Sequence, residues 1–418
     1  MRRLIKGGYV IDPLNHVEGF MNVFIENGKI SGLKTALEQV DESEYDVIDA
    51  SGLVVAPGFI DLHVHLREPG FEHKETIKSG TAACAKGGYT TVACMPNTKP
   101  ALDTKERILS LKAIIEKDAC IEVIPVGAIT MGIAGETLTE HNQLFEAGVI
   151  GLSDDGRTTM DAQLMKMAFL NAKVYNKPIM THSEDHALTC HYKTEVYPIS
   201  AETDIVARDI KLCEETNGHL HVGHVSGAEA IEAIRNAKKN GVHVTCEAAP
   251  HHFALNDERV NPLETKSKVN PPIRSEQHRR AVIEGLKDGT IDIIATDHAP
   301  HDAKSKEVTY ENAAFGISGI ESAFSVAYSI LVLEEGLPLS TLIYKMATRP
   351  AQIMGLNDVG NLSIGSKANV VLLNINQRTV IDASTFVSKG KNTPFDGMKV
   401  QGEVMETIYQ GVTVYKRD

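Results

Sequence analysis

The sequence has no strongly basic cluster and no long apolar run. The formal net charge is −13, so neither nucleic acid nor an anionic membrane surface is an expected partner. No run approaches the ~18 apolar residues that read as a membrane-spanning helix. The first residues, MRRLIKGGYVIDPLN, lack the apolar segment and cleavage site of a secretory signal. These absences predict a protein that acts on small molecules in solution.

Cysteine motifs are also lacking. The six cysteines stand at positions 84, 94, 120, 190, 213 and 246, and none forms a C-x-x-C pair. A chain of 418 residues can bury a core without disulfide bonds, so we interpret these residues as reduced thiols. The sequence therefore predicts a cytoplasmic protein. Its composition, 42% hydrophobic and 23% charged, is typical of a globular chain.

Eight short apolar runs alternate with amphipathic stretches between Leu53 and about Gly355. The runs are 53–66, 90–97, 121–130, 149–155, 178–185, 219–226, 242–252 and 291–300. Apolar strands that alternate with helices are typical of a parallel sheet covered on both faces. Eight regular units favour a closed (β/α)8 barrel of the TIM type over an open, doubly wound α/β sheet.

The two ends of the chain have a different pattern. Residues 1–52 and 358–418 alternate short strands with turns. Neither end can bury an apolar face alone, so we expect them to pair into one small β-sandwich. The predicted organisation is a composite sandwich domain, 1–52 plus 358–418, and a barrel catalytic domain, 53–357. The loop at 190–200 interrupts the barrel and is a candidate lid or interface segment.

Histidines and aspartates follow the predicted barrel strands where the strands end. In chain order they are His63, His65, Asp154, Asp155, His182, His224, His251, His252, Asp297, His298 and His301. Functional residues of a β/α barrel gather at the carboxyl ends of its strands, so we expect these side chains at one rim. Burying such a cluster is costly unless a cation neutralises it. Imidazole and carboxylate ligands indicate zinc or a similar metal.

Each of these residues has a plainer interpretation when it is taken alone. A single histidine at a strand end is more often a packed or hydrogen-bonded residue than a ligand. Asp154 and Asp155 stand before Gly156, a pattern that is typical of a turn or a helix N-cap. The joint register of all these residues with the predicted strands favours the metal site.

Seven segments together resemble the dihydroorotases of the amidohydrolase superfamily. They are GFIDLHVHLREPG, KETIKSGTAACAKGGYTTVACMPNTKP, SDDG, THSED, HVGHVS, EAAPHH and IIATDHAPH. The resemblance covers nearly the whole chain. It is to the bacterial form with an aspartate at the metal-bridging position, because VIGLSDDG holds no lysine for carbamylation. It implies a metal-dependent hydrolase of cyclic amide C–N bonds. The implied reaction is the reversible hydrolysis of (S)-dihydroorotate to N-carbamoyl-L-aspartate in pyrimidine biosynthesis.

The resemblance also implies a binuclear metal site, with two Zn²⁺ ions expected per chain and another divalent metal as the alternative. The implied ligands are His63, His65 and Asp297 for the first ion, His182 and His224 for the second, and Asp155 as the bridge. Asp154 stays open as the alternative bridging residue. Asp297 would also be catalytic, acting as base and then acid around a metal-activated hydroxide.

A further set of residues would bind the substrate. The resemblance implies His65, Arg67, Asn97, Asn270, His301, Phe315 and Gly316. Arg67 lies two residues after His65 and so returns to the same face of the strand. Its planar guanidinium suits a bidentate contact with a carboxylate. Asn97 and Asn270 have plainer interpretations, as a turn residue and a pre-proline loop residue.

Other functions stay open beside this one. Allantoinase and dihydropyrimidinase act on related rings, but LREPG, MPNT and the aspartate at the bridging position argue against both. A catalytically silent scaffold subunit is the third alternative, and the filled ligand positions argue against it. The resemblance finally implies a homodimer.

Overall fold

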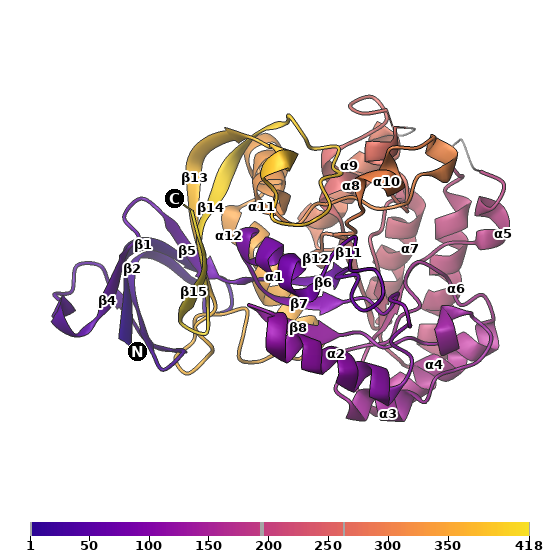
Figure 1. Cartoon of the computed structure of the whole chain (residues 1–418), viewed down its shortest axis with the longest axis horizontal. Coiled ribbons are helices and arrows are strands. Elements are labelled where there is room, and N and C mark those ends of the chain that lie inside the picture. The colour runs from indigo at the N-terminus through magenta and orange to yellow at the C-terminus, as the bar shows by residue number, and fades with distance from the viewer. Residues whose placement is uncertain (1, 193–195, 262–263, 418) are drawn as a thin grey trace.

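The structure of the protein is a computed structural model that describes residues 2–192, 196–261 and 264–417. A sheet built from both ends of the chain lies beside a larger α/β unit built from its middle (Figure 1). The predicted loop at 190–200 includes residues 193–195, which lie outside the described residues.

Both ends of the chain contribute strands to one sheet. Within the described residues its strand order is β15-β14-β13-β5-β1-β2-β3, with β4 paired to β1. The strands are β1 (Arg2–Asp12), β2 (Val17–Glu26), β3 (Lys29–Thr35), β4 (Asp46–Asp49), β5 (Val54–Pro57), β13 (Val370–Val380), β14 (Lys399–Tyr409) and β15 (Val412–Lys416). Val23 from one end and Leu372 from the other belong to the same buried apolar cluster. The two ends therefore stabilise each other, as the sequence predicts.

The apolar run at 53–66 forms two strands rather than one. β5 pairs with β13 in the terminal sheet, whereas β6 (Phe59–Val64) pairs with β7 (Tyr89–Cys94). Gly58 lies between them, and a Cβ atom there would lie 2.4 Å from the side chain of Thr90. The absence of a side chain at Gly58 lets the chain pass closely by β7 as it leaves the terminal sheet.

The central unit is built from parallel strands that follow the chain order. β6, β7 and β8 (Glu122–Pro125) form one sheet; β9 (Ile179–Thr181), β10 (Leu220–Val222), β11 (Val244–Ala248) and β12 (Ile293–Ile294) form another. Single parallel bridges link the two sheets. Leu152 pairs with Gly127 and with Ile179, and Val64 pairs with His298. This order of neighbours is that of the predicted barrel strands.

The predicted strand at 149–155 is wrong in its extent, because only Leu152 of this segment forms bridges. The side chain of Asp154 accepts hydrogen bonds from the backbone N–H groups of Ile129 at 2.9 Å and Thr130 at 3.0 Å. The N–H of Ile129 also donates to the carbonyl oxygen of Ser153 at 3.3 Å, so the side chain of Asp154 shares this donor with the neighbouring segment. A side chain that bonds to nearby backbone in this way competes with regular pairing.

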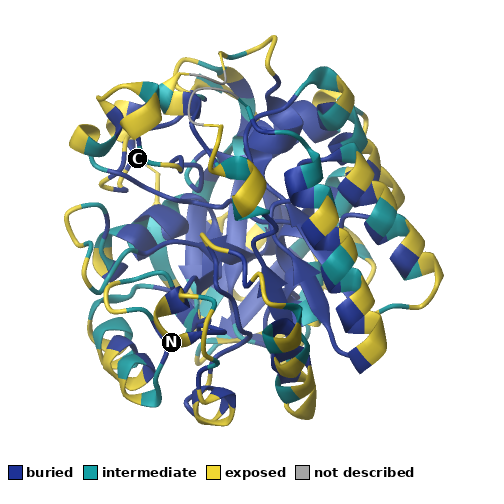
Figure 2. Ribbon diagram, turned by 90° about the vertical axis from the view of Figure 1, so that its right-hand side faces the viewer, coloured by how far each residue is buried: buried dark blue, intermediate teal, exposed yellow. Residues whose placement is uncertain are grey.

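Helices cover the outside of the central strands and expose their outer faces, while the strands are buried (Figure 2). The helices are α1 (Ile77–Lys86), α2 (Lys105–Asp118), α3 (His141–Glu146), α4 (Ala162–Val174), α5 (His186–Thr189), α6 (Ser200–Thr216), α7 (Ala228–Lys239), α8 (Pro250–Ala254), α9 (Glu276–Asp288), α10 (Ala303–Lys306), α11 (Ala323–Ala327), α12 (Leu339–Ile343) and α13 (Arg349–Met354). Thr76, Thr104 and Asp161 cap α1, α2 and α4 with their side-chain oxygens, which satisfies backbone N–H groups at each helix start. Among the residues described, no helix has both the length and the apolar character needed to cross a membrane.

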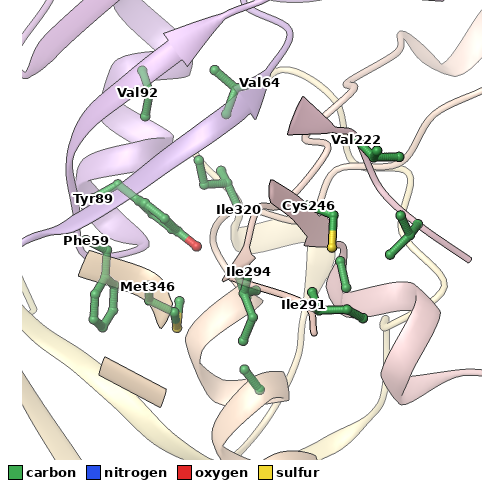
Figure 3. Packing of buried hydrophobic residues seen from close by; sticks show 14 of the residues in the cluster. Phe59, Val64, Tyr89, Val92, Val222, Cys246, Ile291, Ile294, Ile320 and Met346 are labelled. Atoms are coloured by element: carbon green, nitrogen blue, oxygen red, sulfur yellow. The ribbon is translucent and has the colours of Figure 1, made fainter. Parts of the chain in front are cut away.

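The main apolar core lies between these strands and helices. Phe59 and Tyr89, from β6 and β7, are fully buried and their ring centroids are 5.7 Å apart. Figure 3 shows them with Val222, Ile294 and other members of the cluster. Close packing of this kind holds the strands rigidly. The carboxyl ends of the strands, where the predicted ligands stand, are therefore supported by a well-packed core.

Candidate metal centre and substrate pocket

Four imidazoles from the ends of three strands, β6, β9 and β10, surround the carboxylate of Asp155. Its Oδ1 lies 3.2 Å from His63 Nε2, 3.8 Å from His224 Nε2 and 3.9 Å from His182 Nδ1. Its Oδ2 lies 3.4 Å from His65 Nε2. All five side chains are buried. They form two three-residue groups with the spacing of metal ligands, and Asp155 belongs to both groups.

Asp297 stands at the edge of the first group. Its Oδ1 lies 3.2 Å from His65 Nε2 and 3.7 Å from His63 Nε2. Burial alone would raise the pKa of Asp297, but its hydrogen bond to His65 and the charge of His63 lower this pKa to about 2. The carboxylate is therefore ionised at neutral pH.

The donor atoms fit a divalent cation. Within the described part of the chain, His63 Nε2 is buried without a hydrogen-bond partner, although Asp155 Oδ1 is only 3.2 Å away. Burial would raise the pKa of Asp155, yet His63 and His224 bring it well below its usual value. Imidazole nitrogen and ionised carboxylate oxygen atoms that lie this close together are the ligands that zinc and similar divalent ions take.

Asp154, the alternative bridging residue, takes no part in either group. Its Oδ2 accepts hydrogen bonds from the hydroxyls of Thr130 at 2.5 Å and Thr159 at 2.8 Å. With the two backbone N–H groups already described, the carboxylate is fully occupied by the loop around it. The geometry thus places Asp155 rather than Asp154 among the imidazoles.

Asn97 lies between two of the grouped residues. Its Oδ1 is 2.9 Å from His65 Nδ1, and its Nδ2 donates to Asp155 Oδ2 at 3.2 Å. Sequence reasoning assigned Asn97 to the substrate. In the structure it also fixes the ring orientation of His65, so both oxygen and nitrogen of its amide contact the metal centre.

Asn270 belongs to a polar network beside His182. Its Nδ2 donates to Glu184 Oε2 at 2.7 Å, and its Oδ1 accepts from the hydroxyl of Tyr197. The same Glu184 oxygen lies 2.9 Å from His182 Nε2. Sequence reasoning missed Glu184 and Tyr197. The signal for Glu184 was its position two residues after His182 in THSED, which repeats the i, i+2 spacing of the first two histidines.

Glu247 is a second buried carboxylate that the sequence did not reveal. It lies on β11, with Oε1 2.6 Å from His63 Nδ1 and Oε2 3.0 Å from His221 Nε2. Sequence reasoning looked instead to His251 and His252 at the end of this run, but they lie in the short helix α8 beyond the strand. A charged residue in the apolar run VTCEAA was the available signal.

A cavity of about 130 Å³ brings most of the predicted residues together. Its lining comprises His65, Arg67, Asn97, Asp155, Gly156, His182, His224, Asn270, Asp297, Ala299, Phe315 and Gly316. Of the predicted site residues, His63 and His301 alone are outside this lining. His63 contacts the other ligands from outside the lining, and His301 contacts Arg67.

Arg67 supplies the positive charge of this cavity, as the one lysine or arginine among the described lining residues. Its Nε donates to the carbonyl oxygen of Pro300 at 3.2 Å, and its Nη2 lies 3.2 Å from His301 Nε2. That ring nitrogen is 2.7 Å from the carbonyl oxygen of Phe315. Burial and the charge of Arg67 lower the pKa of His301 to about 2. The His301 ring beside Arg67 is therefore neutral.

The sequence matches the model of the amidohydrolase family over residues 54–414. The chain belongs to the amidohydrolase family. Within this family, it is 44% identical to a dihydroorotase of Thermoanaerobacter sp. (strain X514), in an alignment that covers 100% of this chain and 98% of that protein. It is also 44% identical to a dihydroorotase of Geotalea daltonii, with 100% of both chains covered. The resemblance to amidohydrolases that the sequence motifs indicate is confirmed.

Solved structures share the fold of this amidohydrolase. A D-hydantoinase has a TM-score of 0.89 and 26% identity, covering 100% of this chain and 95% of its own. The L-hydantoinase (dihydropyrimidinase) from Arthrobacter aurescens has a TM-score of 0.91 and 24% identity, covering 100% and 96%. The predicted α/β fold class, with a barrel-type unit and strands from both chain ends, is confirmed.

Proposed function

We propose that this amidohydrolase is a dihydroorotase, which reversibly hydrolyses (S)-dihydroorotate to N-carbamoyl-L-aspartate in pyrimidine biosynthesis. The observation that carries this proposal is one small cavity that joins a metal centre to a single arginine. Dihydroorotate has a cyclic amide and a carboxylate on the same ring. Its hydrolysis therefore needs a metal centre for the amide and a positive charge for the carboxylate. The full-length relatives named dihydroorotase support this choice of substrate.

We propose zinc as the metal, with two ions per chain. The first would be held by His63, His65 and Asp297, the second by His182 and His224, and Asp155 would be shared. Bound divalent ions of this kind lower the pKa of water and polarise a carbonyl oxygen. Other divalent metals suit the same donors, and measurement of the metal content distinguishes them.

Asp297 is the proposed base and acid. Its ionised carboxylate lies at the edge of the metal centre and lines the cavity. It would take a proton from the water that attacks the ring amide carbon. It would then deliver this proton to the ring nitrogen as the C–N bond breaks. The new C–O bond completes the carboxylate of the open-chain product.

The substrate carboxylate would pair with Arg67, whose planar guanidinium can donate two parallel hydrogen bonds. The complete set of proposed substrate contacts is His65, Arg67, Asn97, Asn270, His301, Phe315 and Gly316. In this set Asn97 and His301 would act beside Arg67. Asn270 and the backbone of Phe315 and Gly316 would hold the ring amides.

The test is metal content measured together with dihydroorotate hydrolysis, followed by absorbance. We expect the purified protein to contain a divalent metal and to turn over dihydroorotate, to lose activity on chelation and to regain it with zinc. Full activity in a metal-free sample would overturn the proposal.

Hydrolysis of uncharged cyclic amides is the second candidate activity, favoured by the TM-scores to hydantoinases. Turnover of dihydrouracil or allantoin that exceeds turnover of dihydroorotate would replace the first proposal with this one. A protein that binds metal but turns over none of these substrates would support the third alternative, a catalytically silent scaffold subunit.

The remaining expectations are proposals of the same kind. We propose a homodimer, which light scattering of the purified protein tests, and a cytoplasmic location, which the free thiols among the described residues support. We also propose the division into a terminal domain, 1–52 with 358–418, and a catalytic domain, 53–357. The pairing of β5 argues for assigning Val54–Pro57 to the terminal domain.

A further inference from the structure

A buried carboxylate outside the two metal-ligand groups contacts both of them. Glu247 is 1% exposed. Its Oε1 lies 2.6 Å from the ring nitrogen Nδ1 of His63 and accepts the backbone N–H of His224 at 3.2 Å. His63 belongs to one group and His224 to the other. One oxygen atom thus contacts a side chain of the first group and the main chain of the second.

The other oxygen of Glu247 is held by a buried chain of hydrogen bonds. Oε2 lies 3.0 Å from His221 Nε2, His221 Nδ1 lies 2.8 Å from the hydroxyl of Thr245, and this hydroxyl lies 2.9 Å from His219 Nε2. An ionised carboxylate only accepts hydrogen bonds, so His221 carries its proton on Nε2. The chain holds Glu247 in one orientation.

The backbone beside Glu247 is shaped to admit this contact. A Cβ atom at Gly223 would lie 2.9 Å from the carbonyl oxygen of Thr181 and 3.5 Å from both Glu247 Oε1 and His63 Cε1. The next residue, His224, has a φ of 32°, a region that is costly for a residue with a side chain. The hydrogen bond from His224 N–H to Glu247 offsets part of this cost.

We infer that Glu247 is a positioning residue of the metal centre, which orients the ring of His63 and the backbone of His224 together. Because Nδ1 of His63 faces Glu247, Nε2 is the ring nitrogen that faces Asp155 and the shared site. A carboxylate partner of this kind also raises the basicity of a ligand imidazole. The inference rests on the proposed metal centre, and it assigns a role to a residue outside the ligand and substrate sets.

The test is Glu247→Gln, which keeps the size of the side chain and replaces one accepting oxygen with an NH2 donor. The metal-free protein is titrated with zinc against a chromogenic chelator and with cobalt followed by its visible absorption. We expect the zinc affinity to fall about 10- to 100-fold, the usual effect of losing such a partner. We also expect the cobalt spectrum to change, because the geometry of the ligands changes.

Glu202→Gln is the matched control. Glu202 is 2% exposed and accepts the backbone N–H groups of Ser226 at 2.8 Å and Gly227 at 3.1 Å. Among its hydrogen bonds and ion pairs within the described residues, none involves a member of the metal-ligand groups. We expect this variant to lose thermal stability but to retain the zinc affinity and cobalt spectrum of the unmodified protein.

Unchanged zinc affinity and an unchanged cobalt spectrum in folded Glu247→Gln would overturn the inference. If circular dichroism shows that this variant does not fold, Glu247→Asp is measured in its place. This variant keeps the charge, but its shorter side chain withdraws the carboxylate oxygen from His63. A zinc affinity and a cobalt spectrum equal to those of the unmodified protein would then overturn the inference. An unmodified protein that binds no metal would instead remove the proposed function. A metal-loaded, active protein with unaffected Glu247 variants would remove this inference alone.

Discussion

Asp154 and Asp155 are consecutive in the chain, yet their carboxylates contact different parts of the molecule. Asp155 Oδ1 lies 3.2 Å from His63 Nε2, within the metal centre. Asp154 Oδ1 accepts the backbone N–H of Ile129 at 2.9 Å and belongs to the preceding loop. The pair therefore separates metal binding from loop stability, and the two functions can be tested one residue apart.

Replacing each aspartate with asparagine should change a different property: metal content for Asp155 and stability for Asp154. Asp155→Asn removes the charge shared by both ligand groups, so we expect loss of bound metal and of turnover. Asp154→Asn removes the charge and replaces Oδ2, which accepts from the hydroxyls of Thr130 and Thr159, with an NH2 donor. We therefore expect a loss of about 1–3 kcal/mol in the free energy of unfolding. Metal analysis of the purified variants measures the first effect. Thermal unfolding after the metal has been removed by a chelator measures the second. Full metal content in Asp155→Asn would contradict the shared role.

Asp297→Asn should leave a folded protein with little activity. The amide cannot take a proton at neutral pH, and loss of general acid–base catalysis costs about 10²- to 10⁴-fold in turnover. The rate of dihydroorotate hydrolysis and the circular dichroism spectrum are the measurements. Asp302→Asn is the control. The carboxylate of Asp302 accepts a hydrogen bond from the hydroxyl of Ser305 at 2.5 Å, at the start of α10. Normal turnover in Asp297→Asn would exclude this carboxylate from the mechanism.

Arg67→Met should discriminate between charged and uncharged substrates. Each hydrogen bond to a charged group contributes about 1.5–3 kcal/mol, so we expect kcat/KM for dihydroorotate to fall about 100-fold or more. The turnover of an uncharged cyclic imide should fall much less. Arg235→Met, on the outer helix α7, should change neither. Equal losses for both substrates would show that Arg67 does not recognise the carboxylate.

The stability of the amino-terminal turn of α9 should depend on pH through Glu276. Hydrogen bonds from Arg279 Nε and Nη2, both 2.6 Å, lower the pKa of Glu276 to about 2. Because this pKa lies below the ordinary value of 4.5, the stabilisation is complete above that pH and is lost as the pH falls towards 2. The side chain is 39% exposed, so the effect is small.

Comparison with Glu276→Gln measures this contribution. We expect the variant to have a lower Tm than the unmodified protein at pH 7 and the difference to shrink steadily between about pH 5 and pH 3, which brackets the ordinary carboxyl pKa. A difference in Tm that stays constant over this range would assign the effect to packing instead of charge.

The fold could be predicted in outline because apolar runs and amphipathic stretches alternate along the chain. The errors arose where side chains and close approaches decide the pairing. The run at 53–66 divides at Gly58, which packs against Thr90. In the segment at 149–155 only Leu152 forms bridges, and Asp154 shares the backbone N–H of Ile129 with Ser153. Neither contact has a sequence signature, since both partners lie tens of residues away.

The sequence by itself determined which strand ends carry the imidazole and carboxylate side chains of the candidate metal centre. Side chains two residues apart on a strand share a face, so His63 and His65 had to point the same way. Only the tertiary structure decided that Asp155 faces them, and that Glu247 and Glu184 hold the rings from outside. Those contacts depend on the relative position and twist of neighbouring strands, which the packing of the whole core sets and no local spacing encodes.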